Sequence, residues 1–182
     1  STGSIGKTLV KIIKEDKKNF DIILLTADRN YKEILRQAKI LKVKNLVITN
    51  KDSYLRLKEK KIKNIKIYNN YDSFNDIFKN KVDYVMSSIS GIHGLEPTLK
   101  IIRFTKKIAI ANKEAIICGW HLIKKKLTKF KTTFIPVDSE HFSIWSLINE
   151  FRDNHIEKLI ITASGGPFLK RPLNNFKNIK LN

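Results

Sequence analysis

Short runs of consecutive apolar residues alternate along the chain with segments in which apolar residues recur at helical spacing. The apolar runs predict strands at residues 20–25, 46–49, 65–68, 82–87, 108–111, 134–137 and 159–162. The helical spacing predicts helices at residues 4–18, 34–41, 54–61, 97–105, 114–125 and 142–151. Unbroken apolar strands, each followed by a helix, are typical of a parallel sheet covered on both faces. We therefore predict an α/β fold with a Rossmann-like, doubly wound and mostly parallel sheet.

Charge separates the chain into two parts. Its 182 residues carry 36 Lys plus Arg and 17 Asp plus Glu, a formal net charge of +19. Residues 138–182 hold six of the basic and five of the acidic residues, so almost all of the excess lies in residues 1–137. We accordingly predict a nucleotide-binding domain at 1–137 and the start of an α+β catalytic domain at 138–182.

The excess of positive charge does not by itself predict a nucleic-acid partner. Only six of the 36 basic residues are Arg, the residue that base readout favours, and the Lys-rich stretches contain few aromatic residues for stacking on bases. We expect solvated helix surfaces and no nucleic acid; a polyanion-binding module is the alternative. The single cysteine, Cys118, excludes a disulfide scaffold, and no apolar run approaches the length of a membrane span, so no membrane partner is expected.

The first six residues read as a loop that feeds a helix. Gly3 and Gly6 would let the backbone approach a pyrophosphate, and the helix N-terminus would supply N–H groups. An ordinary glycine turn is the alternative. Asp28 follows Gly6 at the spacing of an acidic residue that binds a ribose hydroxyl of NAD, whereas Arg29 next to it could hold the 2′-phosphate of NADP. The choice between these cofactors stays open, as does a role for Asp28 as a helix N-cap.

Three polar clusters follow later strands, where a parallel sheet places its ligand crevice. The first, Asn112-Lys113-Glu114, offers an amide, a cation and a carboxylate. The second contains Asp138 and Glu140, oxygen ligands of the kind that Mg²⁺ prefers, with His141 beside them. The third, Ser164-Gly165-Gly166, suits an anion such as a phosphate ester. Polar turns and acidic helix starts are the structural alternatives.

The stretches STGSIG, ANKE, PVDSEH and SGGPF, in this order and spacing, resemble the 1-deoxy-D-xylulose 5-phosphate reductoisomerase family over essentially the whole chain. The resemblance implies an NADPH-dependent enzyme of the non-mevalonate isoprenoid pathway that requires Mg²⁺ or Mn²⁺. Its substrate is a small sugar phosphate, which it rearranges and reduces to 2-C-methyl-D-erythritol 4-phosphate. The family also implies a homodimer when full length and a cytoplasmic location, or a plastid location in a plastid-bearing eukaryote.

The resemblance also implies roles for individual residues. Those implied to bind the cofactor are Thr2, Gly3, Ser4, Ile5, Arg29, Asn30, Asn112 and Glu114. Those implied to act in catalysis or substrate binding are Lys113, Ser139, Glu140 and Ser164. Asp138 and Glu140 would be two carboxylate ligands of the metal.

We expect the chain to be a fragment that lacks the first strand, a third metal carboxylate and a mobile flap. The fragment alone is therefore expected to be inactive. Two alternatives remain: another Rossmann-type NAD-dependent dehydrogenase, which Asp28 favours, and a non-catalytic remnant that still binds a dinucleotide.

Overall fold

The computed structural model describes residues 1–150, 156–160, 165–166 and 169–178. The chain divides into two compact units, Ser1–Ser146 and Leu147–Asn182. Within the described part of the second unit, the regular structure beyond the end of α7 is a short 3₁₀ helix, Leu173–Asn178. The predicted boundary between 137 and 138 remains a prediction.

The first half of the larger unit is a three-stranded parallel sheet. Its strands are β1 (Leu24–Ala27), β2 (Asn45–Ile48) and β3 (Lys66–Tyr68), in spatial order β1-β2-β3. Helices α2 (Tyr31–Leu41) and α3 (Lys51–Glu59) connect successive strands. Leu46, Val47 and Ile48 are fully buried because helices cover both faces of β2.

The second half repeats this plan. Strands β4 (Val82–Ser87), β5 (Thr105–Ile110) and β6 (Thr133–Pro136) form another parallel sheet in the order β4-β5-β6. Helix α5 (Leu95–Ile101) joins the first two strands, and α6 (Lys113–Phe130) joins the last two. The α/β fold with parallel strands is thus confirmed, with the described strands divided between two sheets.

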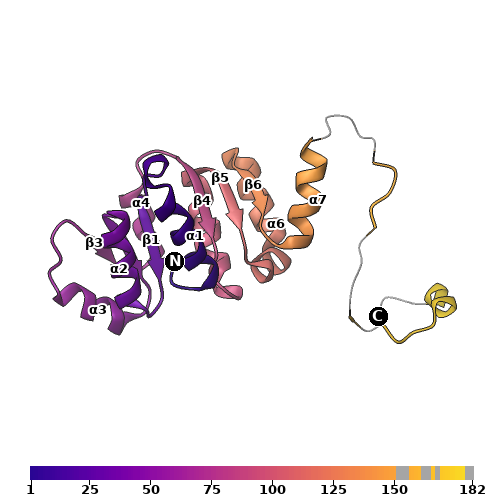
Figure 1. Ribbon diagram of the computed structural model, residues 1–182, viewed down its shortest axis with the longest axis horizontal. Helices are drawn as coiled ribbons and strands as arrows, with labels where there is room; N and C mark the ends of the chain where they lie inside the picture. Colours follow the sequence, from indigo (N-terminus) through magenta and orange to yellow (C-terminus); the bar gives the residue numbers. More distant parts are fainter. Residues whose placement is uncertain (151–155, 161–164, 167–168, 179–182) are drawn as a thin grey trace. The chain divides into compact units, whose positions relative to one another are not determined.

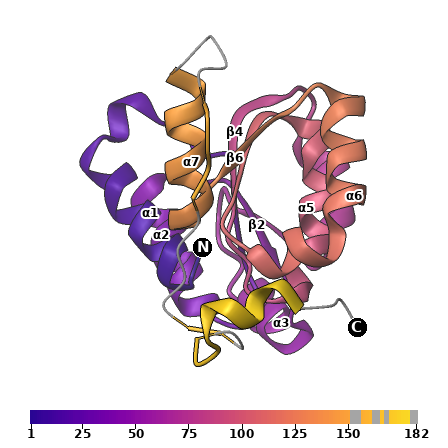
Figure 2. The same cartoon turned by 90° about the vertical axis from the view of Figure 1, so that its right-hand side faces the viewer.

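Helices lie on both sides of the strands (Figure 1). Figure 2 shows α1 (Ser4–Glu15) and α2 on one side and α5 and α6 on the other. One apolar cluster, which includes Leu25, Ile34 and Leu57, lies between the first sheet and its helices. A second cluster joins Val47 of β2 to Ile108 and Ile110 of β5. The two sheets therefore share a core.

Two strand predictions were wrong in position. Residues 20–23 do not belong to β1, because β1 pairs with β2 only from Leu24, which lies opposite Asn45. The chain before Asn45 belongs to the end of α2, where the Val43 N–H donates a hydrogen bond to the Ala38 C=O. Phe20 and Ile23 are exposed instead. Residues 159–160 of the last predicted strand form no strand, and 161–162 lie outside the described residues.

Helix ends also differ from the predicted ones. Helix α6 runs to Phe130, five residues beyond the predicted end at 125, and α1 stops at Glu15. Helix α4 (Phe74–Ile77) was not predicted, because a single turn carries too little periodicity. Helix α7 (Ser139–Glu150) starts three residues before the predicted 142, and the predicted end at 151 lies outside the described residues. None of the helices in the described part of the chain is long and apolar enough to cross a membrane.

Candidate functional site

Helix α1 begins without a side-chain cap. Its N-cap residue is Gly3, no acidic residue lies in its first turn, and no side chain accepts a hydrogen bond from its first N–H groups. By contrast, α2, α3 and α6 are capped by Asn30, Asn50 and Asn112. The first turn of α1 therefore keeps the N–H groups and the positive dipole end that an anion requires.

The two glycines of this loop differ in their surroundings. A Cβ atom on Gly6 would lie 2.5 Å from the carbonyl oxygen of Ser1, so the loop closes against the helix only with glycine there. A Cβ atom on Gly3 would meet nothing within 4 Å. Gly3 is exposed, as are Ser4 and Ile5, and Thr2 is half-buried. Open space in front of uncapped N–H groups fits a phosphate group.

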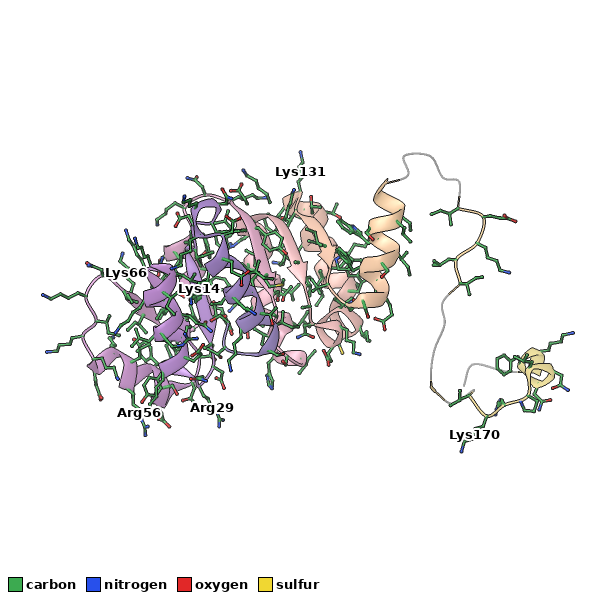
Figure 3. All side chains as sticks on the ribbon, in the orientation of Figure 1. Lys14, Arg29, Arg56, Lys66, Lys131 and Lys170 are labelled. Carbon is green, nitrogen blue, oxygen red and sulfur yellow. The ribbon has the colours of Figure 1, made fainter. Side chains whose placement is uncertain are left out.

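Asp28, Arg29 and Asn30 directly follow β1, at the carboxyl end of the first sheet. Asn30 is the N-cap of α2 and accepts a hydrogen bond of 3.1 Å from the Glu33 N–H. The alternative role of Asp28 as that cap is therefore wrong. The Asp28 carboxylate instead accepts a hydrogen bond of 2.8 Å from the Thr49 hydroxyl and lies 3.4 Å from Nε of Arg29. In Figure 3, Arg29 and Arg56 lie at the lower side and Lys131 at the upper side, beyond the other ends of the strands.

Residues that the sequence analysis did not single out hold this edge in place. Thr49 ends the second apolar run and binds Asp28, while Ser53 donates a hydrogen bond of 2.9 Å to the backbone oxygen of Arg29. Tyr71 lies near Asp28 and Thr49: burial and the charges of Asp28 and Glu96 raise its pKa, and a hydrogen bond with Thr49 opposes them. The signal for Thr49 was present, since it is a polar residue directly after a strand. The roles of Ser53 and Tyr71 depend on long-range packing.

Asn112 follows β5 and is buried. Its Nδ2 donates hydrogen bonds to the backbone oxygens of Ile89 and Gly91, and its Oδ1 accepts one of 2.9 Å from the Ala115 N–H. The side chain therefore ties the loop after β4 to the start of α6. Lys113 and Glu114, the next two residues, are exposed in the first turn of α6.

Asp138 and Glu140 follow β6. Burial alone would raise the pKa of Asp138, but hydrogen bonds from the backbone N–H and the ring of His141 outweigh it, so the pKa is lowered. The 3.0 Å bond from the His141 N–H makes Asp138 a cap for α7, as the structural alternative expected. The Glu140 carboxylate accepts a hydrogen bond of 2.9 Å from the Ser139 hydroxyl.

Electrostatics link the first and second of the predicted polar clusters. The pKa of Glu140 is lowered by hydrogen bonds from its own backbone N–H and from Ser139; the charge of Asp138 raises it and that of Lys113 lowers it. Lys113, Asp138 and Glu140 therefore share one electrostatic neighbourhood at the carboxyl ends of β5 and β6. Ser164, the remaining predicted substrate residue, lies outside the described residues.

A divalent cation fits this donor set in part. Two carboxylates on neighbouring positions can supply oxygen ligands, and Mg²⁺ often takes one or two carboxylates from a protein and completes its shell with water and substrate oxygens. Among the residues that the structure describes, no group of three or more His, Cys, Asp or Glu side chains could hold a metal.

Comparison with known proteins identifies the family of this chain. The family model of 1-deoxy-D-xylulose 5-phosphate reductoisomerase matches residues 1–119, and that of its C-terminal domain matches residues 134–182. The reductoisomerase of Pelagibacter ubique (strain HTCC1062) is 58% identical over all of this chain and 47% of its own length. That of Clostridium tetani (strain Massachusetts / E88) is 36% identical over 98% of this chain and 48% of its own.

Solved structures lead to the same family. The reductoisomerase of Zymomonas mobilis in complex with NADPH has a TM-score of 0.79 at 34% identity and matches 96% of this chain and 46% of its own. A DOX-P reductoisomerase in complex with NADPH, fosmidomycin and magnesium has a TM-score of 0.73 at 28% identity, and it matches 98% of this chain and 47% of its own. The chain spans about half the length of the relatives that it matches. It belongs to the 1-deoxy-D-xylulose 5-phosphate reductoisomerase family.

Proposed function

We propose that the whole protein rearranges 1-deoxy-D-xylulose 5-phosphate and reduces the product with NADPH to 2-C-methyl-D-erythritol 4-phosphate, with Mg²⁺ or Mn²⁺. The observation that carries this proposal is that Lys113, Asp138 and Glu140 follow the neighbouring strands β5 and β6, where the charges of Lys113 and Asp138 act on Glu140, in a chain of this family. A cation beside two carboxylates is a charge pattern suited to a metal ion and an anionic substrate.

The start of the chain is the proposed place of the cofactor's pyrophosphate. The backbone N–H groups at the uncapped start of α1, over Thr2, Gly3, Ser4 and Ile5, would receive it, because no side chain caps this helix within the described residues. Arg29 and Asn30 would lie at the adenosine end. Asn112 and Glu114 would contribute to cofactor binding at the second sheet. Asn112 would do so by fixing the loop after β4.

Asp138 and Glu140 would hold the metal, and the lowered pKa of each keeps it ionised near neutral pH. When bound, the metal polarises substrate oxygens and NADPH supplies a hydride. The His141 N–H donates a hydrogen bond to Oδ1 of Asp138 and so fixes the direction of that carboxylate. Lys113 would bind the substrate, Ser139 would orient Glu140 and contact the substrate, and Ser164 would contact its phosphate group.

The relatives support several further expectations for the whole protein. Since the chain covers about half of their length, residues outside it would complete the metal shell and the phosphate site. We therefore expect the 182-residue chain alone to show no substrate-dependent oxidation of NADPH. The proposed state is a cytoplasmic homodimer whose ligand is a small sugar phosphate.

A direct test measures loss of NADPH absorbance by the whole protein with 1-deoxy-D-xylulose 5-phosphate and Mg²⁺ or Mn²⁺. Asp138→Asn should abolish turnover while leaving NADPH binding intact. Asp76→Asn, which removes an exposed carboxylate from α4, is the matched control. Turnover without added metal, or an unaffected Asp138→Asn variant, would refute the assignment of the metal site. Binding of NADPH without any turnover would favour a non-catalytic dinucleotide-binding protein.

A further inference from the structure

Asp28 is a carboxylate at the point where a dinucleotide-binding fold addresses the adenosine ribose. It is the first residue after β1 and the twenty-second after Gly6. At this place an acidic residue accepts a hydrogen bond from the ribose 2′-hydroxyl of NAD, whereas a nearby Arg accommodates the 2′-phosphate of NADP. This chain has both residue types side by side.

The carboxylate is held in a fixed position. The Thr49 hydroxyl donates a 2.8 Å hydrogen bond to Oδ1, and the backbone of the two strand ends is joined by the bond from the Asn50 N–H to the Asp28 C=O. The side chain is nevertheless 65% exposed. Asp28 therefore holds its second oxygen in a preorganised position next to Arg29, with little rotamer freedom left to lose on binding.

Arg29 is arranged differently. Its backbone oxygen is fixed by Ser53, but its side chain is 82% exposed, and its Nε lies 3.4 Å from Oδ2 of Asp28. A 2′-phosphate bound by this guanidinium would place a second anion next to the Asp28 carboxylate. A ribose hydroxyl brings no such charge, because it donates a hydrogen bond to the carboxylate.

The described ion pairs show how other charges near this edge are engaged. The field of Asp28 reaches Tyr71, and so does that of Glu96. The nearest cation to Glu96 is Lys100, which is already bound at 2.7 Å to both Glu96 and Asp72. Arg29 is thus the cation that the described contacts place on Asp28. When a 2′-phosphate is present, this one Arg has to neutralise both the phosphate and the Asp28 carboxylate.

We propose that Asp28 sets the dinucleotide selectivity of this site, so that it accepts NADH through the ribose 2′-hydroxyl and prefers NADPH only weakly. This inference rests on the proposed function, because it concerns the same cofactor site. It assigns to Asp28 and Thr49 together a role in specificity, with Thr49 as the positioning residue.

The test measures the dissociation constants of NADPH and NADH for the whole protein by calorimetric titration, which does not require turnover. Asp28→Asn keeps the shape and the Thr49 bond but removes the charge. It should tighten NADPH binding about five- to tenfold, the equivalent of about 1 kcal/mol for one exposed charge pair, and leave NADH binding unchanged or weaker. The gain for NADPH should shrink at high salt, because exposed charges are screened.

Glu59→Gln, an equal charge change at the exposed last residue of α3, is the matched control and should leave both constants unchanged. Thr49→Val should shift the ratio of the two constants in the same direction as Asp28→Asn, by a smaller factor. If Asp28→Asn leaves that ratio within twofold of the original, the inference is overturned while the proposed function stands. If neither dinucleotide binds the original protein, both are overturned.

Discussion

The two halves of the larger unit share one plan, but their carboxyl edges carry different chemistry. After β1 and β2 stand Asp28, Arg29, Asn30 and Asn50, and both asparagines cap helices. The edge after β5 and β6 presents Lys113, Asp138 and Glu140 within one electrostatic neighbourhood. A repeated scaffold thus supports one edge suited to the neutral and phosphate groups of a dinucleotide and another suited to a cation and its anionic ligand. The scaffold positions the residues, and the residues decide the chemistry.

The largest expected effect comes from removing a charge at the second edge. Glu140→Gln in the whole protein should lower metal-dependent kcat/KM at least about 100-fold, because stabilisation of developing charge by a bound metal is worth several kcal/mol. The dissociation constant of NADPH should not change. Steady-state kinetics and dinucleotide titration measure both. Glu15→Gln, at the end of α1, is the control, and equal losses in the two variants would erase the contrast between the edges.

The next effect compares the asparagines that follow strands in each half. Asn112→Ala should destabilise the protein by about 2–3 kcal/mol, because it leaves the partly buried carbonyls of Ile89 and Gly91 without this donor as well as removing a cap. Asn50→Ala removes a helix cap and should cost about 1 kcal/mol. Thermal unfolding monitored by circular dichroism measures the difference. Equal shifts in Tm would mean that Asn112 acts as a cap alone.

A pair of glycine substitutions sharpens the description of the first edge. Gly3→Ala should leave stability unchanged, since the new methyl group has open space. It should nevertheless weaken NADPH binding about tenfold, because the methyl group keeps a phosphate away from the N–H groups. Gly6→Ala should destabilise by about 1–3 kcal/mol, because its methyl group would collide with the Ser1 backbone. Titration and thermal unfolding of both variants separate the two effects. A Gly3→Ala variant with unchanged NADPH affinity would argue against a pyrophosphate at this helix.

The smallest effect is on acid stability and comes from Glu33 of α2, a largely covered carboxylate beside the buried Gln37. Hydrogen bonds from Arg36, opposed by burial and assisted by Gln37, lower the pKa of Glu33 from 4.5 to about 2. The unfolded chain therefore binds more protons between these values, so this contribution is present above pH 4.5 and is lost as the pH falls toward 2. Glu33→Gln should remove about 0.5 kcal/mol of pH-dependent stability. Unfolding midpoints measured through this range would show it; parallel curves for the two proteins would contradict it.

Local pattern was sufficient to predict much of the fold. Strand β4 has the predicted bounds of 82–87, where apolar residues stand on both sides of Asp83 and the run ends at Ser87. The same reasoning failed at Phe20 and Ile23, where exposed apolar residues preceded β1. Apolar character predicts a tendency toward burial, but the pairing partner decides where a strand begins.

The site was predictable to the extent that its residues directly follow strands. Lys113, Asp138 and Glu140 could be singled out because parallel strands place their carboxyl ends at one edge. The role of Asn112 could not be, since its partners Ile89 and Gly91 lie more than 20 positions away. Nor could sequence decide between Asp28 and Asn30 as the cap of α2, because both precede the helix and both can accept the hydrogen bond.

The core shared by the two sheets has a consequence for how the protein opens. Because Val47 packs in the same cluster as Ile108 and Ile110, loosening either sheet exposes apolar surface that belongs to both. The backbone amide hydrogens of β2 and β5 should therefore exchange with solvent in one cooperative event rather than in two. The dinucleotide edge and the charged edge would then persist or disappear together, so neither half would survive as a separate working module.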